Sequence, residues 1–143
     1  MNEARRIIEW PESMRTGIDS IDEQHHMLAS MVQFAQSRLS ENSSRTEVEA
    51  VILDLMNYAL YHFDTEEELM LIHGYQLIER EKHCKEHRRF SAAIAQYQQD
   101  IRLGKLVSSD ELFGFIREWL TIHILNTDKK LGEFLFHINQ SNS

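Results

Sequence analysis

The sequence predicts an all-α fold: an antiparallel up-and-down four-helix bundle with an extended N-terminal arm. Three observations support this. The 143 residues include only one proline and five glycines, so long stretches lack helix breakers. Apolar residues recur at steps of three and four along four segments, which keeps one helical face on a shared core. The breaks between these segments are short and polar, which favours antiparallel neighbours.

The first two helices have clear boundaries in the sequence. The first is predicted over residues 19–39, and the second begins after Ser44, which forms a capping-box pattern with Glu47 three residues later. The second helix should end near Gly74, because glycine suits a left-handed C-terminal cap. The apolar stripe of the first helix consists of Ile21, His25, Leu28, Val32, Ala35 and Leu39.

The third and fourth helices follow the same rules. The third is predicted from about residue 77 to Gly104, and Ser108 with Glu111 repeats the capping-box pattern for the fourth. After Asp128 the pattern weakens at Gly132, so we expect residues 133–143 to form a short irregular terminal segment.

We expect one domain over the whole chain. The arm spans residues 1–18, where Trp10 should pack an aromatic ring against the bundle. The bundle spans residues 19–135, and a tail spans residues 136–143.

Composition and charge limit the possible partners. A formal charge of −8 argues against nucleic acid, because no basic patch is present to displace phosphate counterions. The single cysteine, Cys84, cannot form an internal disulfide, and no apolar run suits a signal peptide or a transmembrane helix. We therefore expect a cytoplasmic monomer with no membrane or nucleic-acid partner.

Eight histidines are the unusual feature of the composition. Each predicted helix places at least one on its apolar stripe, and His62 with Glu66, and His83 with His87, lie one helical turn apart. Burying such a set without partners would cost many kcal/mol, which a metal centre would offset. The candidate metal ligands are His25, His62, Glu66, His83, His87, His123 and Asp128.

Seven ligands are too many for one tetrahedral zinc ion, and two carboxylates favour a bridged pair of ions. Two six-coordinate ions that share both carboxylates and a solvent oxygen would keep one position open for a small diatomic ligand. Three histidines remain. His26 lies off the stripe of its helix, His73 lies on its stripe but seven residues past Glu66, and His137 lies in the tail. We interpret them as surface or outer residues.

The motifs around these ligands together resemble the hemerythrin family in its bacterial single-domain form. The resembling segments are Thr16-Gly17-Ile18, Ile21-Asp22-Glu23-Gln24-His25, His62-Phe63-Asp64-Thr65-Glu66-Glu67, His83-Cys84-Lys85-Glu86-His87 and Trp119-Leu120-Thr121-Ile122-His123 with Asp128. The resemblance extends from Trp10 to about Leu135. It implies reversible dioxygen binding, for carriage, storage or delivery, at a non-heme di-iron centre rather than enzyme activity.

The resemblance also implies a role for each ligand. One iron would be held by His83, His87 and His123, and the other, which keeps the open position, by His25 and His62, with Glu66 and Asp128 as bridges. Asp128 follows His123 by five residues, about 140° around an ideal helix. Its assignment therefore rests on the resemblance and implies that the fourth helix distorts or ends there.

The residues next to the ligands suggest a dry pocket that protects bound dioxygen. They are Phe63, Phe90, Trp119 and Leu120. Leu120, three residues before His123, is the best candidate for a wall over the open position, with Trp119 beside it.

Other functions remain open. A ferritin-like oxidase would require a Glu-x-x-His motif on each of two helices, and this pattern is missing. Oxygen or redox sensing through an unidentified protein partner, and handling of iron or nitric oxide, would use the same di-iron site.

Overall fold

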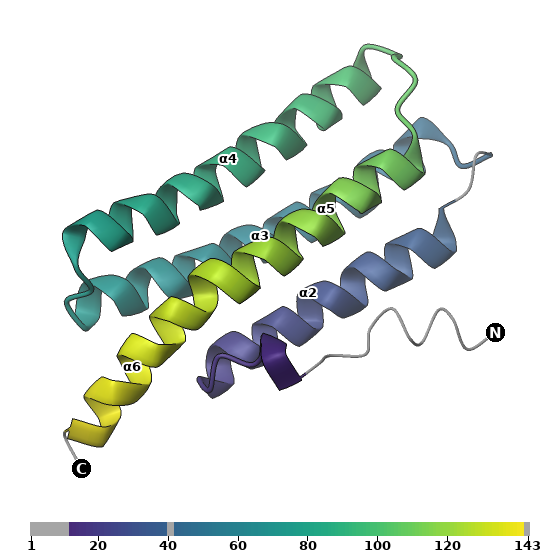
Figure 1. Ribbon diagram of the computed structural model, residues 1–143. Coiled ribbons are helices and arrows are strands. Elements are labelled where there is room, and N and C mark those ends of the chain that lie inside the picture. The colour runs from purple at the N-terminus through teal and green to yellow at the C-terminus, as the bar shows by residue number, and fades with distance from the viewer. Residues whose placement is uncertain (1–11, 40–41, 142–143) are drawn as a thin grey trace.

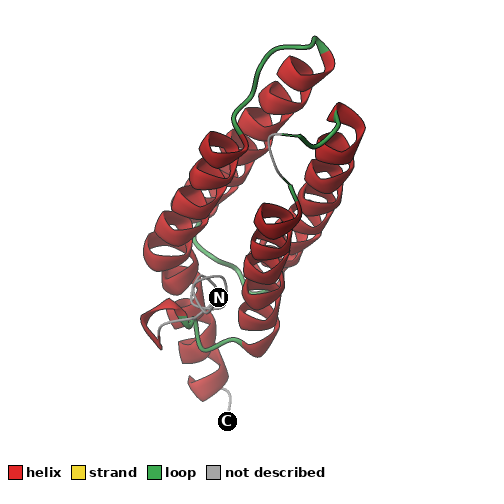
Figure 2. Ribbon diagram, turned by 90° about the vertical axis from the view of Figure 1, so that its right-hand side faces the viewer, coloured by secondary structure: helices red, strands yellow, loops and turns green. Residues whose placement is uncertain are grey.

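The computed structural model describes residues 12–39 and 42–141, and over them it confirms the all-α bundle (Figures 1 and 2). The predicted contact of Trp10 lies outside the described residues. The elements in chain order are η1 (Glu12–Met14), α2 (Asp19–Arg38), α3 (Arg45–Ile72), α4 (Leu77–Arg102), α5 (Ser109–His123), η2 (Ile124–Asp128) and α6 (Lys129–Ser141).

The four long helices contact one another in a closed ring: α2 with α3, α3 with α4, α4 with α5, and α5 with α2. Their directions alternate, so the first half of α2 and of α4 lies at the same end of the bundle as the last turns of α3 and α5 (Figure 1). Apolar side chains fill the space between them, and the largest buried ones include Leu28, Ile52, Phe90, Phe113 and Ile116.

The predicted helix ends are confirmed. The Ser44 hydroxyl accepts from the Glu47 backbone N–H at 3.1 Å, and the Glu47 carboxylate accepts from the Ser44 N–H at 3.3 Å, which completes a capping box. Ser108 accepts in the same way from the Glu111 N–H at 3.2 Å. Gly74 has a positive φ of 70° just after α3, as a left-handed cap requires.

The fourth helix distorts at the predicted place. Residues Ile124–Asp128 form a π-helical turn, in which the Lys129 N–H bonds to the carbonyl of Ile124, five residues back. The wider turn changes the angular relation between His123 and Asp128 and joins α5 to α6 without a loop.

The prediction of an irregular segment over residues 133–143 is wrong, because α6 continues to Ser141. Leu131 and Leu135 bury their side chains in a second cluster with Ile21 and Met70, so the apolar pattern continues past Gly132. A Cβ at Gly132 would lie 2.5 Å from the Thr16 carbonyl oxygen. Gly132 therefore permits a close approach of the N-terminal segment and does not end the helix.

Candidate metal centre

All seven predicted ligands meet in the interior of the bundle. Each has at most 2% of its surface exposed. They come from all four long helices and from the π-helical turn: His25 from α2, His62 and Glu66 from α3, His83 and His87 from α4, His123 from α5, and Asp128 from η2. The alternating helix directions place these positions at the same level along the bundle.

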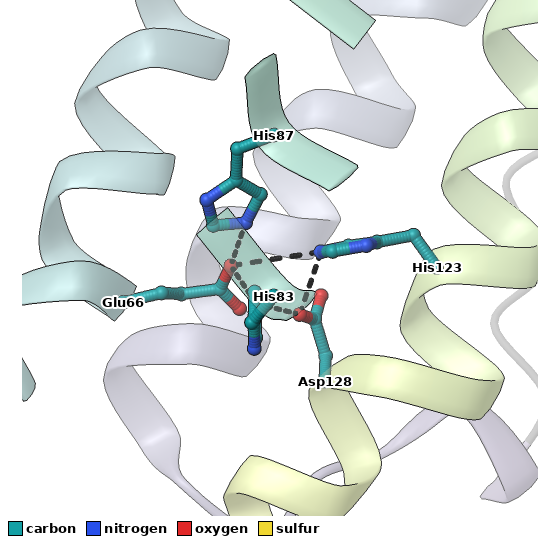
Figure 3. Close-up of side chains that lie close together, drawn as sticks. All are labelled: Glu66, His83, His87, His123 and Asp128. Atoms are coloured by element: carbon teal, nitrogen blue, oxygen red, sulfur yellow. Dashed lines mark hydrogen bonds and ion pairs between the residues drawn. The ribbon is translucent and has the colours of Figure 1, made fainter. Parts of the chain in front are cut away.

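One carboxylate oxygen of each acid faces a group of three histidines (Figure 3). The Glu66 Oε1 atom lies 3.0 Å from the His87 Nε2 atom and 3.3 Å from that of His83. The Asp128 Oδ1 atom lies 2.9 Å from the His123 Nε2 atom and 3.1 Å from that of His83. We call His83, His87 and His123 the three-histidine side.

The second oxygen of each acid faces the other two histidines, His25 and His62, which we call the two-histidine side. The Asp128 Oδ2 atom lies 2.8 Å from the His25 Nε2 atom. The Glu66 Oε2 atom lies 3.5 Å from the His62 Nε2 atom and 3.9 Å from that of His25. Glu66 and Asp128 therefore each present one oxygen to each side, as two bridging carboxylates would.

The donor atoms fit metal ions better than they fit one another. The His62 Nε2 atom and the Glu66 Oε2 atom face each other at 3.5 Å, but both are buried and make no hydrogen bond. Neighbouring ligands about 2.1 Å from one ion lie about 3 Å apart, close to the shortest separations above. Imidazole and carboxylate together suit a first-row transition metal such as iron. The cluster is thus able to hold metal.

The ionisation of the cluster without metal supports this conclusion. Burial lowers the pKa of His62 to about 4. At His83, hydrogen bonds to Asp128 and Glu66 outweigh burial and raise the pKa to about 9. At Asp128, the charge of His123 and three hydrogen bonds outweigh burial and hold the pKa well below its usual value. Protons on histidine thus balance the carboxylates, and metal binding must displace them, so it weakens as the pH falls.

Residues 16–135 match the family model of the hemerythrin HHE cation binding domain. The chain belongs to the hemerythrin family. It is similar to the bacteriohemerythrin of Pseudomonas paraeruginosa, with 34% identity over 119 residues that cover 83% of this chain and 75% of the relative. It is also similar to that of Stenotrophomonas maltophilia, with 30% identity over 135 residues that cover 94% and 86%. A crystal structure of wild-type hemerythrin superposes with a TM-score of 0.79 at 27% identity, covering 88% of this chain and 95% of that one.

The predicted surface histidines lie apart from this centre. His26, His73 and His137 are all exposed, as expected for His26 from its position off the stripe and for His73 from its distance from Glu66 along the helix. His137 lies on α6 and not in an irregular tail, which corrects that part of the prediction. In the described residues, no helix has the length and apolar character needed to cross a membrane.

The outer nitrogens of three histidines make hydrogen bonds that sequence reasoning did not predict. The Nδ1 atoms of His87 and His123 lie 2.8 and 2.7 Å from carboxylate oxygens of Glu67 and Glu86. Because a carboxylate only accepts, both Nδ1 atoms donate, and their Nε2 atoms are free to bind metal. The hydrogen bond from His87 lowers the pKa of Glu67. At Glu86 the bonds from His123 and Thr127 outweigh burial and also lower the pKa.

The third such partner is Gln24, whose Oε1 atom lies 2.7 Å from the His62 Nδ1 atom. Gln24, Glu67 and Glu86 each stand beside a candidate ligand in the sequence, and this adjacency is the signal that could have identified them. Each one, however, pairs with a histidine on a different helix. Only the packing of the helices decides these pairs.

Aromatic rings cover the three-histidine side. The Phe63 ring stacks on His87 with centroids 4.0 Å apart, and the Trp119 ring stacks on His123 at 4.4 Å. Phe90 contacts both aromatic rings, with centroids 5.8 Å from Phe63 and 4.5 Å from Trp119. Trp119 therefore covers the three-histidine side, although it stands directly before Leu120 in the sequence.

The two-histidine side borders a cavity. It has a volume of about 100 Å³ and reaches His25. Leu120 lines it, and two further lining residues, Arg117 and Thr121, come from the same helix. The remaining lining residues are Met14, Leu28, Ala29, Val32 and Ile124, and all of them are apolar. The structure thus leaves the two-histidine side accessible to a small apolar molecule.

Proposed function

We propose that this protein binds dioxygen reversibly at a non-heme di-iron centre, for carriage, storage or delivery. The observation that supports it best is the division of the cluster. Two buried carboxylates each face both groups of histidines, and His25 of the two-histidine group borders a cavity. A pair of ferrous ions would supply the electrons that dioxygen takes up on binding.

Two groups of residues would each hold one iron. His83, His87 and His123 would hold one iron, and His25 and His62 the other, with Glu66 and Asp128 bridging the pair. The smaller donor set borders the cavity, so an open coordination position is expected on that side. The relatives named bacteriohemerythrin support the same role for this chain.

Most side chains that line the cavity are apolar, and they would limit the access of water to His25, while Arg117 and Thr121 add polar groups to the lining. Water and protons promote the loss of bound dioxygen in reduced form, so a dry cavity favours reversible release. Leu120 and Met14 supply apolar surface to this lining from two elements far apart in the sequence, α5 and η1. Their role would be to keep the two-histidine side dry and not to bind metal.

Metal analysis and visible spectroscopy test this proposal. Protein purified from iron-replete cells should contain close to two irons per chain, and the reduced protein should develop a visible band in air. That band should disappear when dioxygen is removed and return when it is restored. A single metal per chain, or zinc in place of iron, would contradict the di-iron centre. Oxidation by air that removal of dioxygen does not reverse would favour redox sensing over carriage.

A further inference from the structure

The outer hydrogen bonds of the centre differ between its two sides. His87 and His123, on the three-histidine side, each bond to a carboxylate, Glu67 or Glu86. His62, on the two-histidine side, bonds to the neutral amide of Gln24 at 2.7 Å. The distances are nearly equal, so the difference lies in the charge of the acceptor.

The orientation of the Gln24 amide is determined by its other end. Its Nε2 group donates to the Thr65 hydroxyl at 3.2 Å, and that hydroxyl donates to the Tyr61 carbonyl at 3.1 Å. The amide oxygen must therefore face His62. Gln24 is buried, with 8% of its surface exposed, so water does not replace this contact.

The charge of the acceptor changes the donor strength of a metal-bound imidazole. A carboxylate draws the Nδ1 proton toward itself and makes the Nε2 atom a stronger donor, which favours the ferric ion. A neutral amide does this less and leaves the ferrous ion relatively favoured. Two carboxylate partners on one side and an amide on the other therefore make the two iron positions electronically unequal.

We propose that Gln24 is a positioning residue that raises the reduction potential of the iron on the two-histidine side, and so keeps it ferrous when dioxygen is absent. This inference rests on the proposed di-iron centre. It deepens that function, because it explains how the accessible iron resists oxidation while the covered iron is held by stronger donors.

The replacement Gln24→Glu tests the proposal with little change in shape. One carboxylate oxygen would accept from the His62 Nδ1–H, and the other would face the Thr65 hydroxyl. That hydroxyl can turn from the Tyr61 carbonyl and donate to the new carboxylate. The hydrogen bonds of residue 24 to His62 and Thr65 would remain, the bond from Thr65 to the Tyr61 carbonyl would be lost, and the charge of the acceptor would change.

The measurement is an anaerobic spectroelectrochemical titration of the iron-loaded protein. Gln24→Glu should retain its iron but shift the oxidation equilibrium at least tenfold toward ferric, a fall of about 59 mV for one electron. It should also autoxidise faster in air. Glu67→Gln makes the opposite change beside His87, so it should raise the midpoint potential of the iron on the three-histidine side. Gln99→Glu adds the same charge at an exposed position on α4 and controls for net charge.

The proposal is overturned if Gln24→Glu shifts the potential no more than Gln99→Glu. If Gln24→Glu fails to fold or loses iron, Glu67→Gln and Glu86→Gln serve as the test instead. The proposal is then overturned if neither variant raises the midpoint potential of the iron centre. Iron-loaded parent protein that does not bind dioxygen would refute the proposed function alone. The potentials would still test the role of Gln24.

Discussion

The two sides of the centre use the same kinds of side chain but differ in what lies behind them. Behind His87 and His123 stand the stacked rings of Phe63 and Trp119. Behind His25 lies a cavity of about 100 Å³ that Leu120 lines. The ligands alone therefore do not decide where a small molecule can enter. The side chains one layer further out decide it, because they either fill the space or leave it open.

The largest effect should come from the residue that joins both sides. Glu66→Ala removes the oxygens that face each group, and we expect iron content to fall to near zero. His62→Ala changes only the two-histidine side, so about one iron should remain on the other side. Metal analysis of both purified variants gives the comparison. Equal iron loss in the two variants would show that the sides are not separable.

The next contrast lies within α2. His25 is buried among the ligands and His26 is exposed. We expect His25→Ala to weaken iron binding by more than about tenfold, since even outer-shell losses have effects of that size. His26→Ala should leave the visible spectrum unchanged. Iron loss in His26→Ala but not in His25→Ala would contradict the arrangement of the site.

A smaller effect is expected at the cavity wall. Leu120→Ala should still bind two irons and dioxygen, but the oxygenated protein should oxidise several times faster because water reaches the two-histidine side. Leu135→Ala is the matched control, since Leu135 is buried in the second cluster and does not line the cavity. Both should lose about 2–5 kcal/mol of stability. Equal autoxidation rates, followed by the visible band, would make Leu120 a packing residue only.

The smallest effect concerns the segment that holds Met14 at the cavity. In Gly132→Ala the new Cβ would lie 2.5 Å from the Thr16 carbonyl oxygen, so the backbone must move, at a cost of about 1–3 kcal/mol. Gly114→Ala, with no atom within 4 Å of its Cβ, should gain about 1 kcal/mol from helix propensity. Chemical denaturation of both variants measures the difference. A stability gain at Gly132 as well would show that Thr16 adapts freely.

The candidate site could be predicted largely from the sequence because its ligands obey helical periodicity. His62 with Glu66, and His83 with His87, are one turn apart, and such pairs share a face in any regular helix. Asp128 does not obey this rule, and only the resemblance to a family placed it in the site. The structure supplies the reason, a π-helical turn over Ile124–Asp128 that a periodic pattern cannot reveal.

By itself, the sequence determined the helices, their capped ends, the buried stripe of each and the set of polar residues on those stripes. These properties depend on residues within a few positions of one another, through local hydrogen bonds and periodicity. Only the tertiary structure decided which histidine meets Gln24, Glu67 or Glu86, which side Trp119 covers, and that α6 continues past Gly132. Those outcomes depend on contacts between helices far apart in the chain, where a small rotation of one helix changes which side chains touch.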